Sequence, residues 1–144
     1  MTAEYRLRGV LADLDTVYGA ISDLAQRHAL PEDVTHPLRL ALDELITNVV
    51  EHGFHGRALD ERRLVLRLDA SGDTVEATIE DNGVPFDPTI AAAADPAGEL
   101  DDRPIGGLGL HLVRRSIDSM HYRRAGDRNL LTITKLRRSL HDGQ

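Results

Sequence analysis

The sequence predicts an α+β fold, a two-layer sandwich in which a mostly antiparallel sheet is covered on one face by about three helices. Apolar residues recur at helical spacing in the longer segments, and they alternate with polar residues in shorter segments between them. Helices on one face of an antiparallel sheet allow both kinds of segment to bury their apolar sides. The 144 residues suffice for one domain, and an aromatic content of only 3% predicts an aliphatic core. Residues 1–144 are therefore expected to form a single domain.

The first half of the chain is expected to hold a short strand followed by two helices. Residues 4–9 are the candidate strand, and helical spacing over residues 11–29 predicts the first helix. The second helix is expected to be capped by Asp33 or Thr35 and to end at Gly53.

The second half is expected to contain two antiparallel hairpins separated by a loop and a third helix. Alternating apolar residues predict the strands, and glycine-containing turns join them. The expected elements are strands 63–70 and 75–79 joined at 71–73, a loop at 88–105, a helix at 108–120, and strands 121–125 and 129–137 joined at 125–127.

The second helix carries three polar residues along one margin of its apolar stripe. Glu44, Asn48 and His52 are four residues apart, and at about 100° per residue such neighbours stack on one helix face. A carboxylate can accept a proton from an attacking hydroxyl, and an amide oxygen suits a hard cation such as Mg²⁺. A solvated margin on an ordinary amphipathic helix has the same spacing, so this pattern alone leaves both interpretations open. The stripe consists of Leu38, Ala41, Leu42, Leu45, Ile46 and Val49.

Two glycine-bearing segments, residues 80–88 and 106–110, favour a ligand site. Glycine lets a ligand approach the main chain closely, and a glycine-rich turn that opens a helix offers free N–H groups to a phosphate. Asp81, at the end of a predicted strand, can accept a hydrogen bond from a ligand amine, although D-x-G also occurs in ordinary turns. The ordered trio of motifs is a much stronger signal than any one of them.

The motifs E-x3-N, D-x-G and G-x-G, in this order, resemble the ATP-binding fold shared by gyrase, histidine kinases and mismatch-repair ATPases. Residues 41–48 (ALDELITN) and 106–115 (GGLGLHLVRR) are most similar to the small bacterial anti-sigma factors that are also serine/threonine-protein kinases. Residues 118–135 resemble the closing hairpin of those proteins. The resemblance covers residues 5–138 and implies the histidine kinase-like ATPase fold.

The resemblance implies ATP and Mg²⁺ as cofactors and gives each motif a role. Glu44 is implied as the general base, Asn48 as the Mg²⁺ ligand and Asp81 as the partner of the adenine amino group. Residues 88–105 correspond to a lid over the nucleotide, in which Arg103 is the candidate for contact with a phosphate. The other implied nucleotide-binding residues are Gly83, Gly107, Leu108, Gly109, Leu110 and Thr132.

Two features depart from the family pattern or have no role in it. Many relatives carry a further glycine after the D-x-G motif, where this chain has Val84 and Pro85. Proline removes an N–H and stiffens the turn, so a tighter or altered approach of the nucleotide is expected. His52 is best explained as a structural imidazole bonded to main chain, because a metal pair with His55 lacks a third ligand.

The implied function is that of a kinase in a partner-switching system. It would phosphorylate an anti-anti-sigma antagonist protein of STAS type, and alternately sequester a sigma factor or an equivalent regulator, as a homodimer. One alternative is a binding module that uses nucleotide only to set its shape, and another is an ATP-binding domain with weak hydrolysis and no protein substrate. An intact Glu44 favours the kinase, since a pure binder has no need of a base.

Composition predicts a cytoplasmic protein that contacts neither nucleic acid nor membrane. The net charge of -7 argues against extended binding to a phosphate backbone. The chain has no cysteine, no apolar run of about 18 residues and no signal-peptide profile at its N-terminus. Cations gather toward the C-terminus, where they suit a solvated face or a surface for an acidic protein partner.

Overall fold

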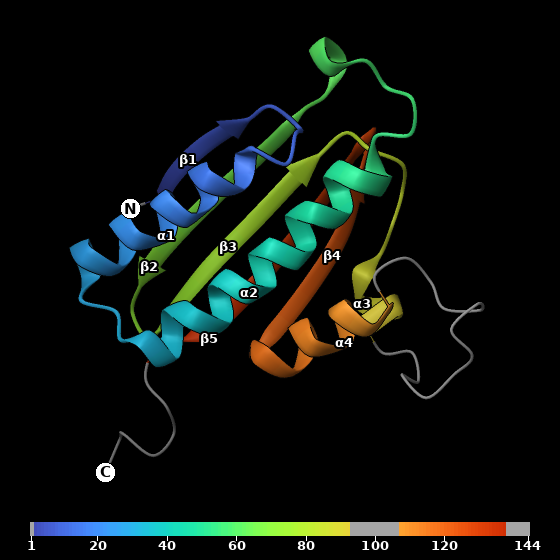
Figure 1. Ribbon diagram of the computed structural model, residues 1–144. Helices are drawn as coiled ribbons and strands as arrows, with labels where there is room; N and C mark the ends of the chain where they lie inside the picture. Colours follow the sequence, from blue (N-terminus) through green and yellow to red (C-terminus); the bar gives the residue numbers. More distant parts are fainter. Residues whose placement is uncertain (1, 93–106, 138–144) are drawn as a thin grey trace.

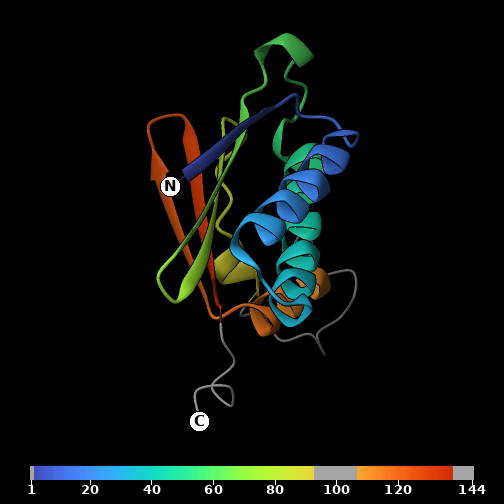
Figure 2. The same ribbon diagram turned by 90° about the vertical axis from the view of Figure 1, so that its left-hand side faces the viewer.

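The computed structural model of the chain describes residues 2–92 and 107–137, which form a five-stranded antiparallel sheet and a helical layer on one of its faces (Figures 1 and 2). The strand order is β1-β2-β3-β5-β4, so the closing hairpin pairs with the first one through its second strand. The predicted α+β sandwich is confirmed. The elements are β1 (Thr2–Leu7), α1 (Asp13–His28), α2 (Glu32–Asn48), β2 (Leu64–Ser71), β3 (Thr74–Asp81), α3 (Pro88–Ala92), α4 (Gly107–Ser116), β4 (Ser119–Ala125) and β5 (Arg128–Leu136).

The core lies between the sheet and the helices and is built from aliphatic side chains. Every second residue of β2 and β3 faces the helices, and the stripe predicted on α2 is buried apart from Val49, which is half-buried. Burial of this kind stabilises by about 1.5–3 kcal/mol for each large aliphatic side chain. The fully buried large side chains include Ile21, Leu38, Leu42, Ile46, Leu66, Leu68, Ile79, Leu110 and Ile133.

The first helix begins at Asp13, two residues later than residue 11, because its carboxylate organises the preceding turn. Asp13 is only 4% exposed, and its oxygens accept hydrogen bonds from the main-chain N–H groups of Arg8, Gly9 and Val10 at 2.7–3.1 Å. One side chain thereby satisfies three main-chain donors, of which that of Gly9 is buried. The helix ends before Ala29, which adopts a left-handed conformation.

The second helix begins at Glu32, so the prediction that Asp33 or Thr35 caps it is wrong. Both residues lie inside the helix, and its first residue follows Pro31 in an extended conformation. The carbonyl of Pro31 accepts hydrogen bonds from the N–H groups of Val34 and Thr35, so the first turn closes without a side-chain cap.

The regular part of α2 ends at Asn48, and residues Val49–Gly53 form a π-helical turn instead of a continued α-helix to Gly53. The N–H of Val84 donates to the carbonyl of Gly53 at 2.8 Å, so the loop after β3 holds this turn in place. A π-turn closes over one more residue than an α-turn. His52 therefore leaves the line on which Glu44 and Asn48 stack.

The segment after β3 and the end of α4 also differ from expectation. Residues Pro88–Ala92 form the short helix α3, where a loop was predicted, and the rest of the 88–105 segment, including Arg103, lies outside the described residues. Helix α4 ends at Ser116 instead of residue 120. The main chain of Asp118 is recruited by β5, because its N–H donates to the carbonyl of Thr134 at 2.9 Å and its side chain accepts from Leu136.

The face of the sheet away from the helices carries a cluster of charges around one buried carboxylate. Glu80, with a side chain 7% exposed, accepts hydrogen bonds from Arg63, Arg67 and Arg128 at 2.7–3.0 Å. Burial alone would raise the pKa of Glu80, but the bonds from Arg63 and Arg67 outweigh it and hold the pKa below its ordinary value. Glu80 is therefore a structural anion, although it adjoins Asp81. No helix in the described part of the chain is long and apolar enough to cross a membrane.

Candidate active site

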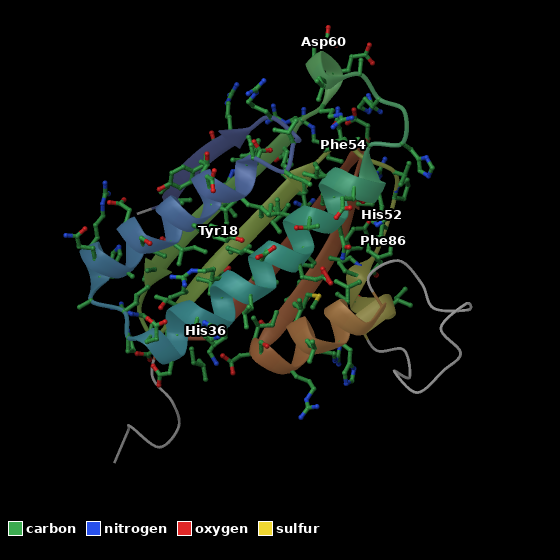
Figure 3. All side chains as sticks on the ribbon, viewed as in Figure 1. Tyr18, His36, His52, Phe54, Asp60 and Phe86 are labelled. Carbon is green, nitrogen blue, oxygen red and sulfur yellow. The ribbon has the colours of Figure 1, made fainter. Side chains whose placement is uncertain are left out.

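A cavity of about 190 Å³ opens between the C-terminal end of α2, the loop after β3 and the strands β4 and β5. Figure 3 shows His52 and Phe86, two of its lining residues, near each other at this end of α2. Ligand sites commonly combine apolar walls with a few polar groups that fix orientation. The polar residues here include Asn48, Asp81 and Asn129, and the apolar walls include Leu45, Val49, Ile79, Val84, Phe86 and Leu131.

Asp81 is the buried carboxylate of this cavity and is only 4% exposed. Its Oδ1 accepts a hydrogen bond from the N–H of Gly83 at 2.8 Å and another from the side-chain amide of Asn129 at 3.0 Å. Burial raises the pKa of the Asp81 carboxyl, and the two bonds oppose that rise because they favour the ionised form. Oδ2 has no donor among the described residues, so it remains able to accept a hydrogen bond from a ligand amine.

Glycine is needed at position 83 because a side chain would not fit there. Its backbone conformation does not require glycine, since its φ is not in the left-handed region. A Cβ at this position would lie 2.5 Å from the carbonyl oxygen of Gly53 and 2.9 Å from Oδ1 of Asp81. The D-x-G loop and the π-turn thus approach each other more closely than any other residue would allow. This contact places Asp81 opposite the end of α2.

Replacing Gly83 by alanine is expected to lower the free energy of unfolding by about 1–3 kcal/mol, because the new methyl meets main-chain atoms that cannot move cheaply. Urea denaturation measures this change. The same variant is expected to bind ATP more weakly, since the loop that holds Asp81 must shift.

Gly19→Ala is the matched control. Gly19 is exposed within α1, and a Cβ there meets no atom within 4 Å. Alanine is therefore expected to raise stability by about 0.5–1 kcal/mol, the usual gain in a helix interior. Equal effects of the two substitutions would show that the loop is not held against Gly53.

Glu44 lies against the first turn of α4. A Cβ added to Gly109 would clash with the carboxylate of Glu44, so the glycine leaves the space that this side chain fills. Burial raises the pKa of Glu44, and the nearby charges of Asp43 and Glu51 add to the effect. A raised pKa makes the carboxylate a better proton acceptor near neutral pH. The packing of α2 on α4 therefore brings a candidate base beside the glycine-rich motif.

Asp43, the neighbouring carboxylate, faces a different element, as the 100° offset along the helix requires. Its Oδ2 accepts a hydrogen bond from the hydroxyl of Tyr18 on α1 at 2.6 Å, and its Oδ1 lies 3.4 Å from the hydroxyl of Thr47. Asp43 therefore ties α1 to α2 and does not compete with Glu44.

Asn48 lines the cavity one turn after Glu44. Its side-chain nitrogen is buried and has no hydrogen-bond partner among the described residues, which is costly for a buried polar atom unless a ligand supplies the partner. The amide nitrogen and oxygen exchange places on a half-turn of the side chain, so this position can present an oxygen ligand to a cation. The residue thus fits the Mg²⁺ role predicted for it.

The remaining predicted residues are only partly brought to the cavity. Gly107 and Leu108 lie in the first turn of α4, and the side chain of Leu110 is fully buried in the core, which leaves only its main chain for a ligand. Thr132 lies on the opposite face of the sheet, since its neighbours Leu131 and Ile133 face the core, and its hydroxyl is 3.1 Å from that of Thr78. It does not line the cavity.

The two histidines at the cavity are exposed. The imidazole of His52 makes no hydrogen bond to main chain within the described part of the molecule, so the structural role expected for it is not found. Neither His52 nor His55 belongs to a metal-binding group, because the described residues contain no cluster of three His, Cys, Asp or Glu side chains suited to a metal ion.

Asn129 is the functional candidate that the sequence reasoning missed. It is 6% exposed, lines the cavity and donates to Asp81. The signal was present in the strand: positions 129, 131 and 133 face the core, and the first of them is polar where the others are leucine and isoleucine. A buried polar residue that interrupts an apolar series requires partners, and those partners identify its site.

Comparison with known families agrees with this geometry. The model of the histidine kinase-like ATPase domain matches residues 8–135 of the chain. The serine/threonine-protein kinase BtrW of Bordetella bronchiseptica is 37% identical over 100 residues, which are 67% of each chain. The serine-protein kinase RsbW of Listeria monocytogenes is 30% identical over 105 residues, which are 70% of this chain and 66% of that protein.

Solved structures show the same fold. The RsbU and RsbW domains of Rv1364c from Mycobacterium tuberculosis align with a TM-score of 0.66 at 17% identity, over 94% of this chain and 32% of that one. The catalytic domain of the histidine kinase ThkA aligns with a TM-score of 0.54 at 11% identity, over 95% and 96% of the two chains. The chain therefore belongs to the histidine kinase-like ATPase family, in the group that includes the serine/threonine-protein kinases BtrW and RsbW.

Proposed function

We propose that this protein is an ATP- and Mg²⁺-dependent serine/threonine-protein kinase that acts as an anti-sigma factor. Its substrate would be an anti-anti-sigma antagonist protein of STAS type, and its alternative partner a sigma factor or an equivalent regulator, bound by a homodimer. The observation that carries the proposal is the position of Glu44. A carboxylate of raised pKa rests on the first turn of α4, one helical turn from Asn48 and its cavity. The kinase names of the relatives support the same reaction class.

The nucleotide would be held at both of its ends by groups already described. Oδ2 of Asp81 accepts a hydrogen bond from the amino group of adenine, inside the apolar walls of the cavity. The N–H groups at the start of α4 would receive the phosphates, where the helix dipole favours negative charge. Mg²⁺, held by Asn48 and phosphate oxygens, would neutralise charge on the transferred group. Mg²⁺ is commonly bound by few protein ligands together with phosphates and water, so one amide suffices.

Transfer then requires a base and an incoming hydroxyl. The side-chain oxygen of the partner's serine or threonine forms a bond to the γ-phosphorus, and the bond from that phosphorus to the bridging oxygen of ADP breaks. ADP leaves with the electron pair of the broken bond, and Glu44 takes the hydroxyl proton. Phosphoryl transfer depends mainly on positioning and charge stabilisation, which the proposed arrangement of Glu44, Asn48 and α4 would supply.

The nucleotide site is tested by calorimetric titration with ATP and ADP, with and without Mg²⁺. Asn48→Ala is expected to weaken Mg²⁺-dependent ATP binding about 10- to 100-fold, the usual effect of disturbing a metal site. Thr47→Ala is the control, because Thr47 contacts Asp43 on another side of α2. ATP binding that stays equally tight without Mg²⁺ and in Asn48→Ala would contradict the assignment of Asn48 as the metal ligand.

Kinase activity is tested with ATP labelled on its γ-phosphate and a panel of purified STAS-type antagonist proteins. The expected result is label on a serine or threonine of one antagonist. ATP binding without transfer to any of them would instead favour a module that uses nucleotide to set its shape. Light scattering with and without nucleotide measures the expected homodimer.

A further inference from the structure

We infer that Asn129 is the positioning residue that sets the nucleobase preference of the site, by fixing which oxygen of Asp81 faces the ligand. This inference rests on the proposed nucleotide-binding function. Asn129 lies on β5, 48 residues from Asp81 in sequence, and the two side chains meet in the buried wall of the cavity. The role is one of orientation, since Asn129 acts through Asp81.

The amide of Asn129 is held by partners on both of its sides. Its nitrogen donates to Oδ1 of Asp81 at 3.0 Å and to the carbonyl of Val84 at 2.9 Å. Both donor positions of the NH₂ group are therefore used. One of them fixes the carboxylate and the other fixes the loop that follows the D-x-G motif.

The amide oxygen of Asn129 faces three donors, which prevent the side chain from turning over. They are the hydroxyl of Tyr122 at 2.5 Å, Nη1 of Arg124 at 3.2 Å and the N–H of Phe86 at 3.4 Å. A flipped amide would direct its NH₂ at the donors of Arg124 and Phe86 and its oxygen at the acceptors of Asp81 and Val84, so it would lose these four bonds at once. Arg124 also donates to the carbonyl of Gly83 at 3.0 Å, so β4 supports the same loop from outside.

This network leaves Asp81 with one oxygen for a ligand. Oδ1 is occupied by Gly83 and Asn129, whereas Oδ2 has no donor within the described part of the chain. A fixed carboxylate oxygen accepts a hydrogen bond from an amino group and repels a carbonyl oxygen in the same place. A site built around one such group discriminates strongly against a ligand that leaves it unpaired. The geometry thus selects a 6-amino purine over a 6-oxo purine.

The test compares ATP with inosine triphosphate, which carries an oxygen where adenine carries its amino group. Dissociation constants with Mg²⁺ are measured for the wild type and for Asn129→Leu, which has a similar volume and no donor. The wild type is expected to prefer ATP about 10- to 100-fold, the range of a hydrogen bond to a charged group. In Asn129→Leu this ratio is expected to fall about tenfold. A merely structural role would weaken both nucleotides equally and leave the ratio unchanged.

Thr134→Val is the matched control, because Thr134 lies on the same strand and on the face away from the cavity. It is expected to keep the wild-type ratio. Should Asn129→Leu fail to fold, Tyr122→Phe tests the role of Asn129 instead. It removes only the hydroxyl that donates to Asn129 at 2.5 Å, and it should reduce the ratio of ATP to inosine triphosphate affinity to a smaller extent.

The outcomes separate this inference from the function on which it rests. A folded wild type that binds neither nucleotide would overturn the proposed function and the inference together. A wild type that prefers ATP, with the same preference in folded Asn129→Leu or in Tyr122→Phe, would overturn the role of Asn129 and leave the nucleotide site standing.

Discussion

Replacing Glu44 by glutamine is expected to lower the rate of phosphoryl transfer about 10²–10⁴-fold, the range for loss of a general base. Glutamine keeps the shape of the side chain and cannot take the hydroxyl proton. Binding of ATP is expected to stay within a few fold, because the cavity is lined by Asn48 and Asp81 and not by Glu44. The measurement is the initial rate of label transfer to the antagonist protein at saturating ATP.

The pH dependence of the rate gives a second signature of Glu44. Burial, with help from the charges of Asp43 and Glu51, raises the pKa of this carboxyl, and a base must be ionised to act. The wild-type rate is therefore expected to fall as the pH decreases through the raised pKa. This acidic decline should be absent from Glu44→Gln.

Asp43→Asn is the control for Glu44→Gln, since it removes the adjacent carboxylate, which bonds Tyr18 instead of facing α4. It is expected to keep most of the activity at some cost in stability. If Asp43→Asn were inactive and Glu44→Gln active, Asp43 would be the base and Glu44 would have a structural role.

Replacing Gly109 by alanine is expected to separate stability from activity. The new methyl would occupy the space of the Glu44 carboxylate, which is the end of a flexible side chain and can swing aside. Folding is therefore unharmed, and alanine in place of a helical glycine adds up to about 1 kcal/mol. The Glu44 carboxylate, the proposed base, would however leave its position, and misplacement of a reacting group by about 1 Å can cost about 10²-fold in rate.

Thermal unfolding and the transfer rate at saturating ATP are measured together for Gly109→Ala. The expected pair of results is an equal or higher Tm and a rate about 10²-fold lower. Gly19→Ala provides the comparison, because it should raise Tm without any change in rate. An unchanged rate in Gly109→Ala would show that Glu44 does not act from its place on α4.

The parts of the fold that sequence periodicity predicted are those decided by local burial. The stripe from Leu38 to Ile46 and the alternation of β2 follow from which residues face the core, and both were visible in the apolar pattern. Helix boundaries that depend on contacts with residues far away in the sequence could not be predicted from the apolar pattern. The end of α4 depends on the bonding of Asp118 to β5, and the π-turn depends on the contact of Gly53 with the loop after β3.

The residues of the candidate site fall into the same two groups, those that local sequence features indicate and those that depend on contacts with distant residues. Short motifs were enough to propose Glu44, Asn48, Asp81 and Gly83, because helix spacing and a turn at a strand end are local features of the sequence. Thr132 was assigned by resemblance, without the strand parity that places it on the far face of the sheet. Asn129 was missed because its importance comes from a pairing across the sheet, which no local spacing reveals.

The π-turn at Val49–Gly53 has a consequence for how this protein tolerates change. Glu44 and Asn48 both lie before it, on regular helix. The next fixed point of the chain is Gly53, which packs closely against Gly83 and accepts a hydrogen bond from the N–H of Val84. The connection that follows, residues 55–61, makes no hydrogen bond to Glu44 or Asn48 in the part of the chain that the structure describes. Insertions in that connection, or shorter forms of it, are therefore expected to change the chain only after Gly53, so the length of the connection can vary while Glu44 and Asn48 keep their mutual spacing.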